Sequence, residues 1–304
     1  MTTDRIPALN IQDLLRQYGL HPSKKLGQNF LQDEHALRKI IEIADIGEKD
    51  TIVEIGPGLG ALTRHLAQVA RLVIAVELDL GLLPPLQAVL RPYNNVRLIH
   101  GDILELHPYE LVDATDYLVV ANIPYYITSA LLRHLLAQSP SRGAGVDLRA
   151  FPMEKPVQKF NFPRPRRLVL TVQEEVAERI CAAPGKMSLL ALSVQVYGRP
   201  EIALRLPAAA FYPAPSVNSA VVAINIYPEP LIPYPRLEIF FRLAKAGFGQ
   251  KRKTLRNALS AVMVREKAEQ LLLAAGIDPM RRAETLSLSE WKNLAERSTP
   301  DNES

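Results

Sequence analysis

Short apolar runs alternate with helical segments from about residue 50 onward. Each run is rich in Val, Ile and Leu, and the five runs cover residues 51–56, 71–78, 95–103, 117–123 and 167–172. A nearly continuous apolar run is typical of a strand that is covered on both faces of a parallel sheet. The alternation therefore predicts an α/β fold with a doubly wound, Rossmann-like sheet.

Two later apolar runs have a different kind of connection. Residues 192–198 and 219–227 are separated by a proline-rich stretch that is too short and irregular for a helical crossover. Parallel strands need a crossover, whereas antiparallel strands do not. We therefore expect these two runs to form an antiparallel hairpin at one edge of the sheet.

Proline-rich stretches divide the rest of the chain. Residues 227–235, YPEPLIPYP, predict an extended linker, and amphipathic segments from 237 to 296 predict a small all-helical domain. We place the sheet domain at residues 1–228 and the helical domain at 229–304. Residues 139–167 carry seven basic and two acidic residues among several prolines, which predicts a long surface loop.

Composition narrows the functional classes. The chain is 48% hydrophobic and 22% charged, as in ordinary globular proteins. No apolar run is long enough to cross a membrane and the start lacks a signal-peptide core, so we expect a cytoplasmic protein with no membrane partner. Cys181 is the only cysteine and the six histidines show no metal-ligand spacing, so we expect neither an internal disulfide nor a metal site.

A glycine-rich turn follows the first strand, in VEIGPGLGAL. Gly56, Gly58 and Gly60 allow a sharp turn and the close approach of a ligand. Glu77 ends the second strand about 20 residues later, where an acidic side chain can accept hydrogen bonds from ribose hydroxyls. These features fit a nucleoside-containing cofactor, and they leave a nicotinamide enzyme open as a competitor.

The next two strands end in polar residues. Asp102 ends the third strand, where a carboxylate can accept from an adenine amino group or can simply cap a turn. The fourth strand leads into NIPYYI, which places Asn122, Pro124 and Tyr125 at the sheet edge where ligands bind.

The NIPY turn suggests a specific chemistry. The Asn122 amide oxygen and a backbone carbonyl can accept hydrogen bonds from an exocyclic adenine amine and localise its lone pair for attack on a sulfonium methyl group. Pro124 would stiffen the turn, and Tyr125 could stack on the base. The same residues also occur in ordinary turns and cores.

Seven motifs occur along the chain in one order: KKLGQNFL, VEIGPGLGALT, VELD, GDIL, NIPYYI, FYPAPSVNSAVV and GFGQKRKTLRNAL. Together they closely resemble the ribosomal RNA adenine N6-dimethyltransferase family over nearly the whole chain. The resemblance implies a class I S-adenosylmethionine-dependent methyltransferase fold with an added helical domain. It also implies a set of residues around the S-adenosyl-L-methionine pocket, namely Asn29, Leu31, Gly56, Gly58, Glu77, Asp102 and Asn122.

The resemblance also assigns Phe211, in FYPAPSV, to the ring that faces Tyr125 across the target adenine. Residue type alone favours a core position for Phe211. The stretch 242–256 has several basic residues and no acidic one. It is expected to contact RNA phosphates through four side chains, Lys251, Arg252, Lys253 and Arg256.

The resemblance implies methyl transfer to two adjacent adenosines near the 3′ end of small-subunit ribosomal RNA, within an assembling subunit, by a monomeric enzyme. The alternatives are a large-subunit methyltransferase of the macrolide-resistance type and a non-catalytic RNA-binding assembly factor. A nicotinamide dehydrogenase is a distant third. The sequence departs from the family pattern at 139–167, which looks longer, and at Asn218, where relatives often have Asp.

Overall fold

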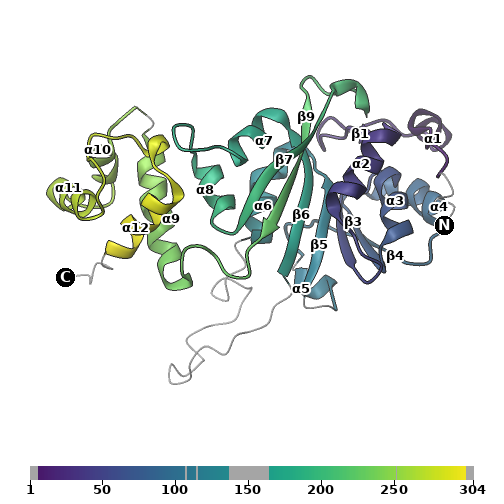
Figure 1. Ribbon diagram of the computed structural model, residues 1–304. Helices are drawn as coiled ribbons and strands as arrows, with labels where there is room; N and C mark the ends of the chain where they lie inside the picture. The colour runs from purple at the N-terminus through teal and green to yellow at the C-terminus, as the bar shows by residue number, and fades with distance from the viewer. Residues whose placement is uncertain (1–5, 107, 114–115, 137–163, 251, 299–304) are drawn as a thin grey trace. The chain divides into compact units, whose positions relative to one another are not determined.

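The computed structural model describes residues 6–106, 108–113, 116–136, 164–250 and 252–298 (Figure 1). The chain divides into two compact units. The first unit comprises Met1–Ala177 and Glu201–Ile226, and the second comprises Glu178–Pro200 and Tyr227–Ser304. Contacts thus group residues 178–200 with the second unit, whereas the sequence prediction placed them with the sheet.

The first unit is built on a seven-stranded sheet with the strand order β4-β3-β2-β5-β6-β9-β7. The strands are β2 (Thr51–Ile55), β3 (Leu72–Glu77), β4 (Val96–His100), β5 (Asp116–Asn122), β6 (Arg164–Gln173), β7 (Gly198–Leu206) and β9 (Ser219–Ile226). β2 pairs in parallel with β3 and β5, β3 with β4, and β5 with β6, whereas β9 runs antiparallel to β6. The predicted parallel sheet with an antiparallel edge is confirmed.

Burial follows the apolar runs that predicted the strands. All five residues of β2 are buried, as are five consecutive residues of β5. A strand in the middle of such a sheet is covered on both faces, which is why these runs do not alternate with polar residues. The core of the first unit gathers side chains from β2, β5, β6 and β9 with those of the N-terminal helices.

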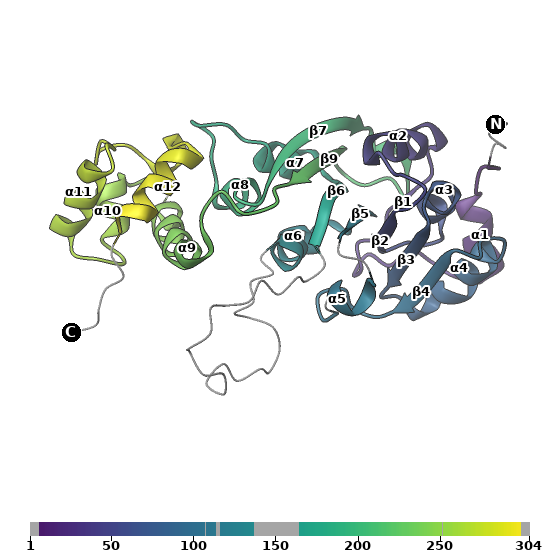
Figure 2. The same ribbon diagram turned by 60° about the horizontal axis from the view of Figure 1, so that its bottom comes forward.

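Helices connect the strands of the first unit. They are α1 (Ile11–Gln17), α2 (Glu34–Ala44), α3 (Ala61–Val69), α4 (Leu83–Leu90), α5 (Pro108–Leu111), α6 (Thr128–Leu136) and α7 (Glu174–Ile180), together with the 3-10 turns η1 (Leu80–Leu82), η2 (Tyr125–Ile127) and η4 (Ala208–Ala210). Asp33 caps α2 by accepting a hydrogen bond from the Ala36 N–H. α2 packs on α3, and α3 packs on β3 (Figures 1 and 2).

A second, two-stranded sheet brings the N-terminal segment toward the main sheet. β1 (Phe30–Leu31) pairs antiparallel with β8 (Phe211–Tyr212), with Leu31 opposite Phe211. β1 also contacts α3, the helix that follows the glycine-rich turn. Residues far apart in the chain thereby meet beside the carboxyl ends of β2 and β3.

The second unit is helical. Its helices are α8 (Leu189–Gln195), α9 (Tyr234–Gly249), α10 (Leu255–Leu259), α11 (Arg265–Ala274) and α12 (Leu288–Arg297), with a 3-10 turn, η5 (Ala283–Thr285). α12 begins with a capping box between Ser287 and Glu290. α9 approaches Trp291 so closely that a Cβ on Gly247 would lie 2.7 Å from its ring. The predicted C-terminal helical segments are confirmed.

Two local predictions were wrong. The predicted strand at 192–198 is absent up to residue 197, because Ser188 caps a helix by accepting a hydrogen bond from the Ala191 N–H, and this helix, α8, extends to Gln195. The strand that neighbours β9 is β7, in which exposed positions alternate with half-buried ones between two buried ends, as expected of an edge strand. The expected loop at 139–167 also ends earlier, since 164–167 belong to β6, and its residues up to 163 lie outside the described ranges.

The described residues contain neither a membrane-spanning helix nor a metal-binding cluster. None of the described helices is long and apolar enough to cross a membrane. Among the same residues, no group of three His, Cys, Asp or Glu side chains could hold a metal ion.

Candidate active site

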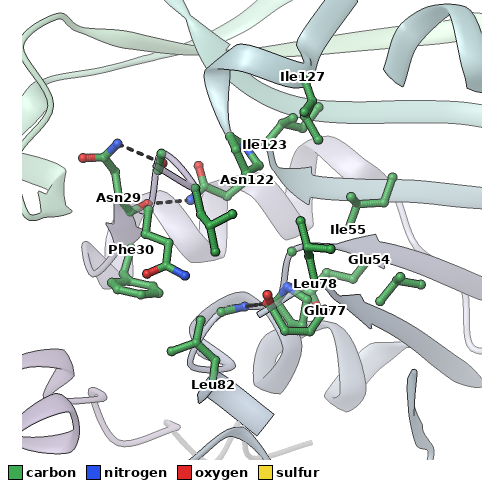
Figure 3. A pocket seen from close by; sticks show the side chains of 18 of the residues that line it. Asn29, Phe30, Glu54, Ile55, Glu77, Leu78, Leu82, Asn122, Ile123 and Ile127 are labelled. Carbon is green, nitrogen blue, oxygen red and sulfur yellow. Dashed lines mark hydrogen bonds between the residues drawn. The ribbon is translucent and has the colours of Figure 1, made fainter. Parts of the chain in front are cut away.

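A pocket lies at the carboxyl ends of β2, β3 and β5, the edge where open α/β sheets bind ligands. Figure 3 shows it from close by. Five segments and two single side chains line it: residues 26–31, 54–62 except Gly60, 76–78, 101–104 and 122–127, with Ile11 and Leu82. The pocket thus contains every predicted cofactor residue, together with Pro124 and Tyr125.

The glycine-rich turn lines the pocket. Gly56 and Gly58 have φ values of +68° and +61°, a region that residues with a Cβ rarely adopt. A Cβ on Gly58 would lie 3.0 Å from the Phe30 ring. Glycine at this position therefore allows the N-terminal segment to close against the turn and leaves the backbone open to a ligand.

Glu77 holds this turn from the next strand. It is 5% exposed, and its carboxylate accepts hydrogen bonds from the Gly58 N–H at 3.0 Å and the Asp79 N–H at 2.8 Å. Burial raises the pKa of Glu77 above its usual value, although the backbone donors oppose this shift. Each carboxylate oxygen keeps a further lone pair that can accept from a ribose hydroxyl.

Glu54, which sequence reasoning missed, lies beside Glu77 on the pocket wall (Figure 3). It is 2% exposed, and its Oε2 has no hydrogen-bond partner in the described structure. Burial, with a contribution from the nearby Glu77 charge, raises the pKa of Glu54 to about 8. The signal available in the sequence was an acidic residue inside a buried apolar strand, which is rare without a function.

The Asn122 amide is held in one orientation at the end of β5. Its Nδ2 donates a hydrogen bond to the Asn29 backbone carbonyl at 2.9 Å, as the dashed line in Figure 3 shows. The Asn29 side chain donates to the Gly27 carbonyl at 3.2 Å. Because Nδ2 of Asn122 is occupied by Asn29, its Oδ1 is the atom left to accept from a ligand.

The turn that follows Asn122 is fixed by its own hydrogen bonds. The Ile127 N–H donates to the Pro124 carbonyl at 3.2 Å, and the Thr128 hydroxyl donates to the Tyr125 carbonyl at 3.1 Å. The Tyr125 hydroxyl lies 2.6 Å from Oγ of Ser219 on β9. Burial raises the pKa of Tyr125, so this side chain is a neutral phenol at physiological pH.

The N-terminal segment forms one wall of the pocket and is latched to the end of β3. The Gln28 Nε2 donates to Asp79 Oδ2 at 2.6 Å, and its Oε1 accepts from the Ser23 N–H at 2.7 Å. Leu31 is 3% exposed and belongs to both the pocket wall and the core. The latch by Gln28 was not predicted, because its partner lies 51 residues away in sequence.

Asp102 has the structural role that its residue type allowed and also reaches the pocket. Its Oδ1 accepts a hydrogen bond from the Leu104 N–H at 2.9 Å, which stabilises the turn after β4. Its carboxylate lines the pocket together with Gly101. A role in holding an adenine amino group remains a prediction.

Phe211 is not among the residues that line the pocket. It is 2% exposed, pairs with Leu31 through β8, and belongs to the core of the first unit. A ring buried in this way presents no open face to a base in this structure. The structure thus places Phe211 in the core, as its residue type favours, and its pairing with Tyr125 around a base remains a prediction.

The predicted phosphate-binding residues belong to the second unit and differ in their surroundings. Arg252 and Lys253 are exposed. Arg256 is half-buried, and its Nη1 lies 3.2 Å from Glu269 Oε1. Lys251 lies outside the described residues. Arg252 and Lys253 are therefore better candidates for binding phosphate than Arg256, whose charge already has a partner.

The pocket fits an adenosyl cofactor that carries positive charge. The glycine turn leaves backbone open where a Cβ would meet Phe30, and three acidic side chains, Glu54, Glu77 and Asp102, lie along the same edge. Carboxylates can accept from ribose and adenine and can also stabilise a cationic sulfonium group. With a pKa of about 8, Glu54 is mostly a neutral acid at pH 7, so the negative charge beside a ligand comes from Glu77 and Asp102. A pyrophosphate would gain nothing from these acidic neighbours, whereas a cationic sulfonium would.

Comparisons with known proteins agree on one family. The family described as Ribosomal RNA adenine dimethylase matches residues 20–299. A Ribosomal RNA small subunit methyltransferase A of Dehalococcoides mccartyi (strain CBDB1) is 45% identical over 294 residues, covering 95% of this chain and 93% of the relative. The protein of the same name from Geobacillus kaustophilus is 38% identical over 302 residues and covers 95% of each chain.

Solved structures agree with the fold. The crystal structure of 23S rRNA methyltransferase ErmE has a TM-score of 0.67 at 25% identity and covers 88% of this chain and 99% of that one. A dimethyladenosine transferase from Plasmodium falciparum has a TM-score of 0.70 at 22% identity and covers 87% of this chain and 95% of that one.

Proposed function

The chain belongs to the ribosomal RNA adenine dimethylase family, and on that premise we propose that it dimethylates two adjacent adenosines near the 3′ end of small-subunit ribosomal RNA during ribosome assembly. The methyl groups come from S-adenosyl-L-methionine and go to the N6 amines, in four transfers per RNA. The proposal rests above all on Asn122, whose amide is held by Asn29 so that its oxygen is left for the target amine.

Different residues of the pocket would bind different parts of the cofactor. Glu77 would accept from the ribose hydroxyls and Asp102 from the adenine amine, and both residues line the pocket. The open backbone at Gly56 and Gly58 allows the ligand to lie against the turn. When bound, the cofactor supplies a sulfonium methyl group, which is an electrophile that needs no metal ion or acid catalyst.

The target amine needs acceptors more than it needs a base. An adenine N6 lone pair is delocalised into the ring, so the nitrogen is a poor nucleophile while it stays planar. Asn122 Oδ1 can accept one of its protons, and a backbone carbonyl of the turn can accept the other. The Ile123 carbonyl, which directly follows Asn122 in the chain, is the proposed second acceptor. Two acceptors placed for a pyramidal nitrogen favour a geometry that is met in the transition state.

Tyr125 would hold the extruded base from one side. Stacking of a base on an aromatic ring contributes about 1 to 3 kcal/mol. After the attack, the methylated nitrogen is cationic and acidic enough to lose its proton to water, so no strong base is required. Pro124 immediately precedes η2 with a φ of −57°, and its ring would keep the turn stiff so that the Tyr125 ring leaves it in one direction.

RNA binding is assigned to the second unit. The exposed side chains of Arg252 and Lys253, with Lys251 next to them in sequence, would contact phosphates and position the RNA without reading its bases. We propose that the enzyme acts as a monomer in the cytoplasm and that its partner is the assembling small ribosomal subunit.

A second candidate is a large-subunit adenine methyltransferase, which the likeness to ErmE favours. The relatives at 38% to 45% identity over 95% of the chain favour the small-subunit enzyme. The decisive experiment incubates the protein with labelled S-adenosylmethionine and with small or large ribosomal particles that lack the modification. We expect label on two adjacent adenosines of the small-subunit RNA. Label confined to large particles, or no label, would contradict the proposal.

A further inference from the structure

The hydroxyl of Tyr125 is attached to a buried residue of a distant strand. Its oxygen lies 2.6 Å from Oγ of Ser219, a residue that is 0% exposed and begins β9, opposite Gln173 of β6. We propose that Ser219 is a positioning residue that fixes the Tyr125 ring in the orientation required for stacking on the target adenine. This inference rests on the proposed function and adds a residue to it.

The backbone of the turn does not need this contact. The Pro124 and Tyr125 carbonyls already accept hydrogen bonds from Ile127 and Thr128, and the Ile123 N–H donates to the Thr171 carbonyl at 3.2 Å. What the Ser219 contact adds is restraint on the side-chain torsions of Tyr125. A ring that can rotate loses conformational entropy when a base stacks on it, whereas a restrained ring has already lost it.

The chemistry of the contact also favours a positioning role. A buried serine hydroxyl costs free energy unless it is hydrogen-bonded. A phenylalanine beside an alanine would fill the same space without that cost. Of the two tyrosines in the turn, Tyr126 is 58% exposed, whereas Tyr125 has its hydroxyl bonded to Ser219 at the far end of its ring.

Two substitutions break the same hydrogen bond from opposite sides. Ser219→Ala and Tyr125→Phe each remove one oxygen atom and leave the backbone pairing of β9 with β6 in place. If the bond positions the ring, each variant loses the same restraint. The double variant should therefore be no slower than the slower single variant, because effects that act through one contact are not additive.

The measurement is kcat and KM for methyl transfer to small ribosomal particles that lack the modification, with cofactor affinity from calorimetry. We expect kcat to fall by about 3- to 10-fold in each single variant, as for the loss of one hydrogen bond. KM for the particles and the cofactor affinity should stay within about twofold of wild type. A role limited to folding would change thermal stability without this selective loss of kcat.

Thr51→Val is the matched control. Thr51 is 3% exposed, lies at the opposite end of the sheet in β2, and its hydroxyl accepts from Arg71 at 2.5 Å. This variant should lower stability and keep kcat unchanged. An equal loss of kcat in the control, wild-type kcat in Ser219→Ala, or losses that multiply in the double variant would each overturn the inference. If the wild-type protein itself transfers no methyl group to small particles, the proposed function fails as well, so the two failures can be told apart.

Discussion

Replacing Glu77 with alanine should destabilise the first unit even before a cofactor is added. The carboxylate accepts from two backbone donors, Gly58 and Asp79, of which the Gly58 N–H is buried. Leaving a buried donor without a partner costs about 1 to 3 kcal/mol, and a half-buried donor that water can reach costs less. Alanine also relieves the cost of burying the Glu77 charge, so we expect a net loss of about 2 kcal/mol.

That loss can be measured as a shift in melting temperature. For a unit of this size, 1 kcal/mol corresponds to roughly 2 to 4 °C, which predicts a decrease of about 4 to 8 °C for Glu77→Ala. Cofactor affinity should fall by a further 5- to 150-fold or so, because the proposed acceptor for the ribose hydroxyls is also lost. Differential scanning calorimetry without the cofactor and titration calorimetry with it separate the two effects. An unchanged melting temperature in the absence of cofactor would refute the reasoning.

Glu54→Gln is the matched comparison, because Glu54 is a second buried carboxyl on the same edge of the sheet. Its pKa of about 8 in the folded protein lies above its ordinary value. A raised carboxyl pKa means that the folded state binds more protons, so its contribution to stability is full below the ordinary pKa and is lost as the pH rises through about 8. Glutamine does not ionise. The variant should therefore be at least as stable as wild type at pH 7, with an advantage that grows from about pH 4.5 and levels off above about 8.

Three further predictions test the site and the RNA surface. Asn122→Ala should lower kcat by about 100- to 1,000-fold while cofactor affinity falls much less, and near-normal turnover in a methyl-transfer assay would contradict the mechanism. Gly58→Ala should weaken cofactor binding by at least roughly fivefold in calorimetry, since its φ is +61° and its new Cβ would lie 3.0 Å from an aromatic ring; wild-type affinity would remove the turn from the site. Neutralising Arg252 and Lys253 together should reduce the log–log salt slope of RNA binding by about 1.4 to 1.8, whereas Arg256→Ala, which removes an ion-paired side chain, should lower stability and keep the slope. If wild type, the double variant and Arg256→Ala all show the same salt slope, the segment is an ordinary solvated surface that does not bind RNA.

Features that depend on local pattern could be predicted from the sequence. The strands β2, β3 and β5 are short apolar runs that end in Gly56, Glu77 and Asn122, and parallel strands end at one edge of a sheet. That argument predicted from the sequence alone that the three residues lie together at one edge of the sheet. It failed for residues 192–198, where a serine N-cap made a helix from an apolar run that is equally suited to a strand.

Features that depend on long-range contacts could not be predicted in the same way. The charge of Arg256 is paired with Glu269, which lies on the following helix, and the basic run gave no sign of this pairing. The sequence around Phe211 fits both a core position and a ring that faces the target base. Its pairing with Leu31 in the two-stranded sheet shows that it is buried. Neither contact can be predicted from the local pattern of hydrophobic residues.

The position of β5 explains why the NIPY turn can be held from both ends of the chain. β5 lies between β2 and β6 in the sheet, so the turn at its carboxyl end has neighbours on both sides. Asn122 is held by Asn29, 93 residues earlier, and Tyr125 by Ser219, 94 residues later. The proposed acceptor and the proposed stacking ring, only three positions apart, are thereby restrained by independent segments. Since methyl transfer requires the amine and the base to be aligned together, loosening either segment should slow the same chemical step, through the amide in one case and through the ring in the other.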